Sequence, residues 1–391
     1  MLDSPLQRRR ALFVFFLLTG LAVASWVTRT PAIRDQLGVS IAEMGMILFS
    51  ISVGAMTGIL SSGRLVQRWG TKPVIRSGIL LMLSGLGVLA VGLGAPMVFL
   101  AALGLMLFGL GIGVGEIALN VEGAEVERIT AKPALAMLHA GFSLGTFLGG
   151  VVGIYLASIA FPVTWHIGLT ALLGVPLTLW GLQAIPPDVG IETDSTADTS
   201  AEPGPPFKPW QDGQLLCISL IVLGMALAEG SATDWIPILM VDEHGFNAAL
   251  GSMVYTGFAG MMALGRFSGH FFLKHFSRVA VVRTSALLGV IGISLVIFSA
   301  NPYVAATAVL FWGLGTSLGF PLTISAAGDT GNHPTARVSV VATAGYIAFL
   351  AGPPLLGFLG EHFSLRQALL VVLFFVALAF FLARAVSPRI K

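Results

Sequence analysis

The chain has 391 residues, of which 55% are hydrophobic and only 10% are charged. Average soluble domains carry about 25% charged residues, so this composition excludes most soluble enzymes, and its apolar content excludes a disordered chain. The formal net charge of +2 is too small to indicate a nucleic-acid binder, and the single cysteine, Cys217, excludes a disulfide framework. The sequence therefore predicts a polytopic, all-α membrane protein.

Twelve apolar segments along the chain have the roughly 20 residues that a helix needs to cross a bilayer. The first follows Arg8, Arg9 and Arg10. It lacks the small-residue cleavage site of a signal peptide, so we expect this span to be retained. We predict the twelve spans at about residues 11–28, 41–63, 74–93, 97–120, 134–158, 163–184, 214–238, 248–272, 280–299, 303–326, 338–359 and 366–386.

Lysine and arginine are unevenly distributed between the two sides of these spans. With the N-terminus in the cytoplasm, 17 of the 21 basic residues fall on the cytoplasmic side. Arg29, Arg34 and Arg366 fall on the other side, and Arg266 falls within a span. The positive-inside rule therefore predicts that both termini are cytoplasmic, as an even number of spans also requires.

The middle of the chain separates two blocks of six predicted spans. Residues 186–212 are acidic, proline-rich and poor in apolar side chains, which predicts little stable structure. The predicted organisation is an N-terminal six-helix bundle at 1–185, a cytoplasmic central loop at 186–212 and a C-terminal six-helix bundle at 213–391.

The two blocks are related in sequence. A shift of 206 residues places Pro31 on Pro237, and a shift of 204 places Gly109-Leu110-Gly111 on Gly313-Leu314-Gly315. Two parallel six-span repeats are an architecture of secondary transporters, which bind their solute near the midplane and expose it alternately to each side. The repeat therefore predicts two pseudo-symmetric bundles with a solute site between them.

A run of glycines and bases follows the second predicted span, from Gly63 to Lys72. It resembles the cytoplasmic loop signature of the major facilitator superfamily, although Gln67 stands where that signature usually has aspartate. The resemblance implies the twelve-helix major facilitator fold and gating roles in both halves. An equally weighted alternative is that these bases only cap helix ends. The residues concerned are Gly63, Arg68, Gly70, Lys72, Arg266, Gly269 and Lys274.

Glu116 and Asn120 lie four residues apart in the fourth span, on one helix face. The glycine-rich run before them and the E-x-x-x-N spacing are similar to the fourth helix of fucose-permease-like sugar/proton symporters. That resemblance implies that Glu116 is a protonation site. A carboxylate removed from water can accept a proton near neutral pH, which avoids carrying its charge through an occluded state. The alternative is a hydrated glutamate near the cytoplasmic end of the span. Glu122, Glu125 and Glu127 are expected to form a cytoplasmic charged cluster that Arg128 and Lys132 balance.

The fifth span contains Leu138-His139-Ala140-Gly141-Phe142, whose order is similar to the fifth helix of the same branch. His139 can donate to a substrate hydroxyl or share a proton with Glu116. The alternative is a histidine hydrogen-bonded inside the bundle. We add Phe142, Trp26 and Tyr346 as aromatic candidates for substrate contact.

The seventh span contains Glu229 and, six residues later, Trp235. This spacing resembles the seventh helix of the sugar-transporting relatives. Trp235 offers a flat apolar face on which a sugar ring can stack, and Glu229 offers hydroxyl acceptors or a second proton-coupling site. Asp234 is expected nearer the outer end, as a solvated gate residue.

Two arginines lie within or beside predicted spans. The fucose permeases carry an aspartate near the position of Trp26, and none is present here, so one proton carrier of that branch is missing. Arg29 is a candidate to bind an anionic substrate group or to pair with Asp234, and the alternative is that it snorkels to the interface. Arg266 is expected at the cytoplasmic end of the eighth span.

Several sequence signatures of other functions are absent. There is no phosphate-binding loop of the form G-x-x-x-x-G-K-S/T, no His/Cys zinc cluster and no G-x-S-x-G elbow, so we expect no enzyme, no metal and no cofactor. The proline of the drug-efflux motif G-P-x-x-G-G is replaced by Thr146, and the fourth span has no arginine before Arg128. Both features count against drug/proton antiport.

Together these features predict a proton-coupled symporter of a small polar solute, with a sugar as the leading candidate, in a bacterial inner membrane. We expect a monomer whose partners are solute, protons and membrane lipid, without nucleic acid. The first alternative is proton-driven efflux of an amphipathic drug or metabolite. The second is a transporter-shaped receptor that binds solute without moving it.

Overall fold

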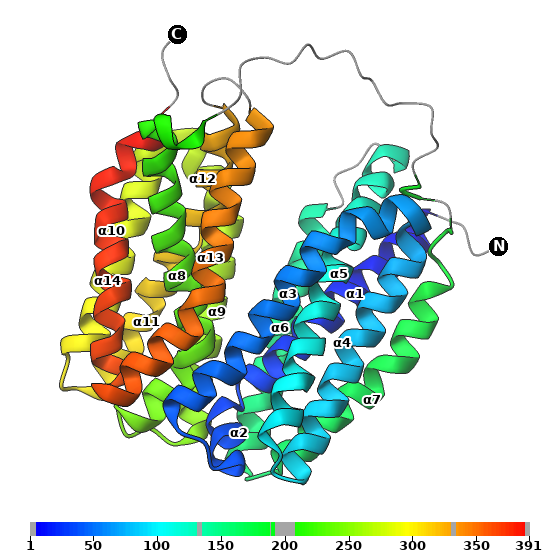
Figure 1. Ribbon diagram of the computed structural model, residues 1–391, viewed down its shortest axis with the longest axis horizontal. Coiled ribbons are helices and arrows are strands. Elements are labelled where there is room, and N and C mark those ends of the chain that lie inside the picture. Colours follow the sequence, from blue (N-terminus) through cyan, green and yellow to red (C-terminus); the bar gives the residue numbers. More distant parts are fainter. Residues whose placement is uncertain (1–4, 131–134, 188, 192–207, 330–333, 388–391) are drawn as a thin grey trace. The chain divides into compact units, whose positions relative to one another are not determined.

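The computed structural model describes residues 5–130, 135–187, 189–191, 208–329 and 334–387, and within these ranges the protein is helical, without a strand. Twelve stretches of the described chain are long and apolar enough to cross a membrane, which confirms the predicted fold class. The chain divides into two compact units, Met1–Thr196 and Ala197–Lys391 (Figure 1). Most of the predicted central loop, 192–207, lies outside the described residues.

The first unit contains seven described helices, one more than the six predicted spans. The additional helix, α2, is a short segment between the first two spans; it has a proline in its first turn and ends at Gly38, whose φ of 64° is left-handed. The helices are α1 (Pro5–Val27), α2 (Thr30–Leu37), α3 (Ile41–Trp69), α4 (Thr71–Gly94), α5 (Val98–Thr130), α6 (Leu135–Ser158) and α7 (Val163–Leu182).

Helix α5 packs against both α3 and α4 through its glycine-rich run. A Cβ atom at Gly109 would lie 2.2 Å from the carbonyl oxygen of Ile51 in α3, and one at Gly111 would lie 2.3 Å from the amide nitrogen of Met82 in α4. Small residues allow such backbone contact between membrane helices. The glycines that mark this span in the sequence therefore bring three helices into direct contact.

A buried ion pair joins α1 to α5 near one end of the first unit. Arg8 pairs with Glu122, whose side chain is fully buried, and the hydroxyl of Thr71 donates to the same carboxylate at 2.5 Å. Glu122 was expected to be balanced by Arg128 and Lys132, but its charge partner is Arg8, because a buried carboxylate requires a close partner of opposite charge. Lys132 lies outside the described residues. Glu125 does pair with exposed Arg128, at 2.6 Å, as part of that expected cluster.

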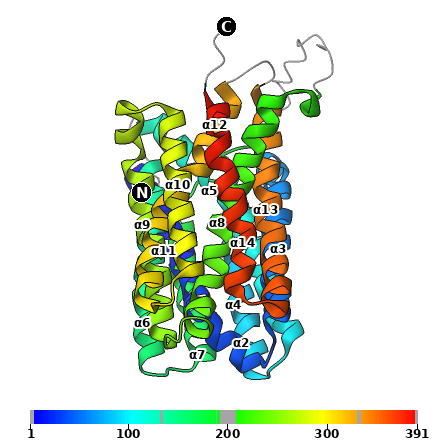
Figure 2. The same cartoon turned by 90° about the vertical axis from the view of Figure 1, so that its left-hand side faces the viewer.

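The second unit is shown most clearly in Figure 2. Asp212 caps the start of its first long helix by accepting from the amides of Gln214 and Leu215, and it also pairs with the buried Arg337. The elements are η1 (Pro209–Gln211), α8 (Gly213–Asp242), α9 (Ala248–His275), α10 (Arg278–Phe298), α11 (Pro302–Thr316), α12 (Gly319–Asp329), α13 (Pro334–His362), α14 (Leu365–Leu382) and η2 (Ala383–Val386).

The tenth span is interrupted, whereas the sequence predicted one continuous helix over 303–326. Helix α11 ends at Thr316 and α12 begins at Gly319. The Ser317 hydroxyl donates to the Leu314 carbonyl at 2.7 Å, which competes with the helical hydrogen-bond ladder. In addition, residue 321 is proline, which has no amide hydrogen to donate to the carbonyl four residues earlier, that of Ser317. The break therefore leaves a backbone acceptor at Ser317.

Candidate solute and proton site

Three of the predicted site residues are connected within the first unit. His139 of α6 and Asn120 of α5 are joined by a hydrogen bond of 3.1 Å between Nε2 and Oδ1. The Asn120 amide donates in turn to the backbone carbonyl of Glu116 at 2.9 Å. The ring of Phe16 packs edge-on against His139 with 5.0 Å between centroids. This chain of contacts gives α5 and α6 a shared polar patch.

Glu116 lies in the middle of its helix, 18 residues after Val98 and 14 before Thr130. Its side chain is exposed, as is that of His139. An ionisable side chain in the middle of a membrane span faces a water-filled path or the bundle interior rather than lipid. The exposed face that carries Glu116 is therefore a candidate for the solute pathway.

A second polar site lies in the second unit. An Nη2–Oε1 distance of 2.8 Å joins Arg266 of α9 to Glu229 of α8. The Nε of Arg266 donates to the carbonyl of Ser317, at the break of the tenth span, at 3.4 Å. Arg266 was expected at the end of its helix, but nine residues separate it from His275, where α9 ends. Its long side chain instead provides the charge partner that a carboxylate inside a span requires.

Arg29 is held at the junction of α1 and α2. Only 5% of the residue is exposed, and its Nη2 donates to the carbonyl of Phe161 at 2.6 Å. Burial lowers the pKa of the guanidinium from its ordinary value. The structure thus buries Arg29 against the connection between α6 and α7, which differs from the snorkelling alternative.

The two predicted tryptophans lie in packed interiors. Trp26 is 3% exposed and packs edge-on against Phe108, and Trp235 is 1% exposed in the second unit. Neither presents an open ring face, so this arrangement offers no stacking platform for a sugar at Trp235. Phe142 and Tyr346 are half-buried, and the ring of Tyr346 lies 6.5 Å from that of Phe320.

The predicted gating residues other than Arg266 lie towards helix ends. Gly70 joins α3 to α4 with a φ of 80°, and a Cβ there would lie 2.6 Å from the carbonyl oxygen of Pro187. The neighbouring Thr71 amide donates to the carbonyl of Val189 at 2.7 Å, so the segment after α7 contacts this junction. A left-handed backbone and a close contact both require glycine at this position.

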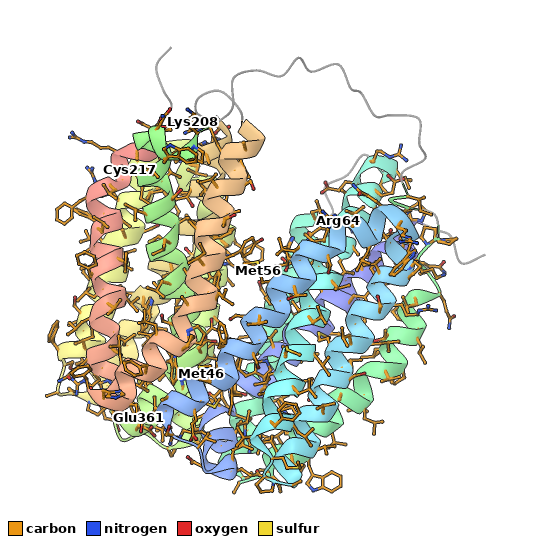
Figure 3. All side chains as sticks on the ribbon, viewed as in Figure 1. Met46, Met56, Arg64, Lys208, Cys217 and Glu361 are labelled. Atoms are coloured by element: carbon orange, nitrogen blue, oxygen red, sulfur yellow. The ribbon has the colours of Figure 1, made fainter. Side chains whose placement is uncertain are left out.

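The basic members of this set differ from Gly70 in their burial. Arg68 and Lys274 are exposed in the last turns of α3 and α9, and Lys72 is half-buried at the start of α4. Gly63 has open space around it, whereas a Cβ at Gly269 would meet the side chain of Leu318. Figure 3 shows Arg64, a further base of the same run, on α3. Cations at helix C-termini interact favourably with the helix dipole, which is the alternative weighed for these bases.

The sequence did not reveal several polar contacts. Three contacts depend on residues far apart in the chain: the pairing of Arg8 with Glu122, that of Asp212 with Arg337, and the hydrogen bond from Arg266 to the Ser317 carbonyl. One local signal existed for the last of these. A proline four residues after Ser317 removes its helical donor, and could have been read from the sequence.

The chain matches the Major Facilitator Superfamily over residues 11–341 and belongs to that family. It is therefore a multi-pass secondary transporter that moves a small molecule, and it is not an enzyme. An uncharacterized transporter of Sinorhizobium fredii, y4wD, is 30% identical over 94% of this chain and 95% of its own. An uncharacterized transporter of Yersinia pestis is 28% identical over 90% and 89%, respectively.

A third relative resembles only part of the chain. The 4-hydroxybenzoate transporter PcaK of Pseudomonas aeruginosa is 31% identical over 184 residues, which is 45% of this chain and 39% of its own. Solved structures cover nearly all of the chain at low identity and show the fold alone. The nucleoside transporter NupG superposes with a TM-score of 0.78 at 13% identity, covering 98% of this chain and 99% of its own. The Escherichia coli fucose:proton symporter FucP has a TM-score of 0.65 at 17% identity, covering 98% and 100%.

Proposed function

We propose that this transporter is a proton-coupled symporter of a small polar solute bearing hydroxyl groups, with a sugar as the first candidate. The observation that supports this proposal is the chain of contacts from His139 through Asn120 to Glu116 on the exposed face of α5 and α6. Glu116 is the proton carrier in this proposal, and Glu229 is a second proton-coupling group. The E-x-x-x-N spacing in α5 supports placing the chain in the fucose-permease-like branch.

Asn120 and His139 are suited to recognising hydroxyl groups. A carboxamide both donates and accepts, and a neutral imidazole has one donor and one acceptor nitrogen. Because they already bond to each other, a hydroxyl that inserts between them can accept from Nε2–H of His139 and donate to Oδ1 of Asn120, which leaves neither group unpaired. The relative that transports 4-hydroxybenzoate also has a solute with a hydroxyl group.

The orientation proposed for the chain follows from its basic residues. Arg8, Arg64 and Lys274 lie near the ends of α1, α3 and α9 that the charge distribution assigns to the cytoplasm. Both termini are then cytoplasmic, in a bacterial inner membrane, and the transporter works as a monomer surrounded by lipid.

The test of proton coupling is uptake by proteoliposomes containing the whole chain, with a pH gradient imposed and a panel of labelled sugars. We expect Glu116→Gln to abolish gradient-driven accumulation while retaining exchange of solute between the two sides. Retention of exchange also serves as the control for folding. Full gradient-driven accumulation by the variant would refute the proton role of Glu116.

The same experiment separates the alternatives. A receptor would bind solute without exchange, so counterflow in the wild type excludes that function. Accumulation confined to hydrophobic cations, in the direction of export, would favour efflux and assign Glu116 and Glu229 to cation binding.

A further inference from the structure

The Arg266–Glu229 pair lies deep within the second unit. Glu229 is 16 residues after the start of α8 and 13 before its end, and Arg266 is 18 residues after the start of α9. Placing charges at such depth is costly, and charges found there commonly mark solute or ion pathways. We therefore consider a role for this ion pair in solute or proton binding, in addition to its contact between α8 and α9.

The two side chains differ in their accessibility. The Arg266 side chain is 43% exposed, whereas that of Glu229 is 15% exposed. A charged guanidinium inside a span does not face hydrocarbon, so its exposed part faces an aqueous path. Arg266 is thus reachable by a solute while it remains bound to Glu229.

The break in the tenth span lies directly against this arginine. A Cβ at Gly265, the residue before Arg266, would lie 2.1 Å from the Ser317 hydroxyl oxygen. Arg266 supplies a donor to the Ser317 carbonyl, for which Pro321 has none to offer. Discontinuous helices in transporters commonly present such backbone groups at their binding sites. The Ser317 contact orients the guanidinium and leaves further donors for a ligand.

We propose that Arg266 binds a carboxylate group of the transported solute, that Glu229 occupies this position when solute is absent, and that a proton bound by Glu229 releases the guanidinium to the solute. This inference rests on the proposed proton-coupled transport and specifies its substrate as a hydroxylated carboxylate, such as a sugar acid.

The present partner of Arg266 indicates which anion fits. The guanidinium is already bound by a carboxylate oxygen, and arginine binds carboxylates with paired, parallel donors. Exchanging one carboxylate for another retains the same kind of contact. The proton on Glu229 balances the charge, since one anion and one proton enter the site together and no net charge is added.

The second unit contains other titratable groups on the helices around the pair, and several of them are bound elsewhere. Tyr255 of α9 lies within electrostatic range of both Glu229 and Asp234, and it is buried. Arg337 pairs with Asp212, Asp329 pairs with Arg278, and Arg366 donates to backbone carbonyls. The remaining groups on these helices and on η2 are Cys217, Asp242, His270, Lys274, His275, Arg283, Tyr303, Tyr346, Glu361, His362 and Arg384. Asp234 is therefore the second carboxylate that could cause a pH dependence of binding, and the experiment must distinguish it from Glu229.

The experiment measures the melting temperature of the purified full chain with a panel of hydroxylated monocarboxylates from glycolate to gluconate. Each acid is paired with the corresponding neutral polyol, and each is titrated at pH 5.5 and 7.5. A ligand that binds only the folded protein raises the melting temperature by mass action. We expect a shift for at least one acid, larger at pH 5.5, and a weaker one for its polyol.

Variants then assign the effect to the pair. We expect Arg266→Gln to weaken acid binding on the order of 10- to 100-fold, the range of a lost charge-assisted hydrogen bond. Glu229→Gln should bind the acid equally well at both pH values, because the guanidinium no longer has an internal competitor. Asp234→Asn should retain the wild-type pH dependence. The charge-neutral double variant Glu229→Gln/Arg266→Gln leaves no unpaired charge and controls for folding.

Three results would overturn the inference: no acid shifts the melting temperature more than its polyol, Arg266→Gln binds acids as the wild type does, or the pH dependence follows Asp234 instead of Glu229. The proposed function would survive any of these if a neutral sugar still accumulated through Glu116. Conversely, pH-dependent acid binding at Arg266, without gradient-driven uptake, would refute proton-coupled transport and leave a carboxylate receptor.

Discussion

The two halves of this transporter place their charges on different helices. Under the 204-residue shift, Glu116 and Asn120 of α5 correspond to Phe320 and Ile324 of α12. The first unit therefore has its acid on the fourth span, whereas the second has an ion pair on its first and second spans, at Glu229 and Arg266. The repeat therefore retains the positions of the helices more strictly than the polar side chains inside them.

The same pair of spans differs in continuity. Helix α5 runs unbroken through Ile112-Gly113-Val114, and the corresponding Thr316-Ser317-Leu318 interrupts the tenth span. Two hydroxyl side chains that bond to nearby carbonyls, followed by Pro321, account for the interruption. A few differences between the repeats thus accompany a straight helix in one and, in the other, a broken helix whose Ser317 carbonyl is bound by Arg266.

Both halves nevertheless bury an arginine–carboxylate pair near a helix end. In the first unit Arg8 pairs with Glu122, and in the second Arg337 pairs with Asp212. The shift relates neither pair to the other, because Arg8 corresponds to Gln214 and Glu122 to Ala326. The two halves therefore contain similar buried ion pairs at positions that the repeat does not relate.

The largest effect we predict is on the buried pair of the first unit. Glu122→Gln removes the carboxylate and leaves the Arg8 guanidinium buried without its counter-ion, which typically costs about 3–5 kcal/mol. We expect a loss of this size in the free energy of unfolding, measured by denaturant titration in detergent. The matched variant Glu125→Gln, which disrupts an exposed pair, should leave stability nearly unchanged. Equal losses in the two variants would contradict the distinction.

A smaller effect is expected where the repeats agree. A Cβ at Gly111 would lie 2.3 Å from the Met82 amide nitrogen, and one at the corresponding Gly315 would lie 2.4 Å from that of Gly289. Overpacking against backbone typically costs about 1–3 kcal/mol, so Gly111→Ala and Gly315→Ala should be comparably destabilising. Gly63→Ala, with nothing within 4 Å of its Cβ, should be neutral or slightly stabilising. The same denaturant titration compares them, and unequal losses would show that the two contacts are not equivalent.

The smallest effect concerns a loop where the halves differ. His244 follows α8, and the 206-residue shift places it on Gly38, which has no titratable group. Burial, and secondarily the positive charge of Arg366, lower the pKa of His244 from its ordinary 6.5. The unfolded chain then takes up this proton at higher pH than the folded chain, so stability present above pH 6.5 is lost as pH falls through the folded pKa.

His244→Asn should remove this part of the pH dependence. Melting temperatures measured between pH 7.5 and pH 5 should fall less steeply for the variant than for the wild type. Superimposable curves would show that His244 does not contribute.

Much of the candidate site could be predicted because it is local. Glu116 and Asn120 lie one turn apart on α5, so helical periodicity alone places them on one face. The contact between Asn120 and His139 joins consecutive spans, and family resemblance brought both residues to attention. The sequence singled out Arg266 but assigned it to a helix end. Hydropathy locates a span, but it does not show which other side chain an arginine within that span will contact.

The burial of the aromatic candidates also could not be predicted from the sequence. Trp26 and Trp235 have the chemistry of a stacking platform, but both rings are packed inside their bundles. Burial depends on which face of a helix meets its neighbours, and both helices have weak amphipathicity because they are apolar nearly all around. A membrane helix of this kind does not reveal its buried face through its pattern.

The sequence by itself determined the class of this protein, its twelve spans and its division into two related halves. These features follow from composition, from segment length relative to bilayer thickness and from internal repetition, all of which are properties of the chain alone. Only the tertiary structure decided that Glu122 is buried with Arg8, that Glu229 is bound by Arg266 and that the carbonyl at the break of the tenth span is also bound by Arg266. Each of these contacts joins distant segments, and its energy depends on the geometry and solvent exclusion that exist only after the helices have packed.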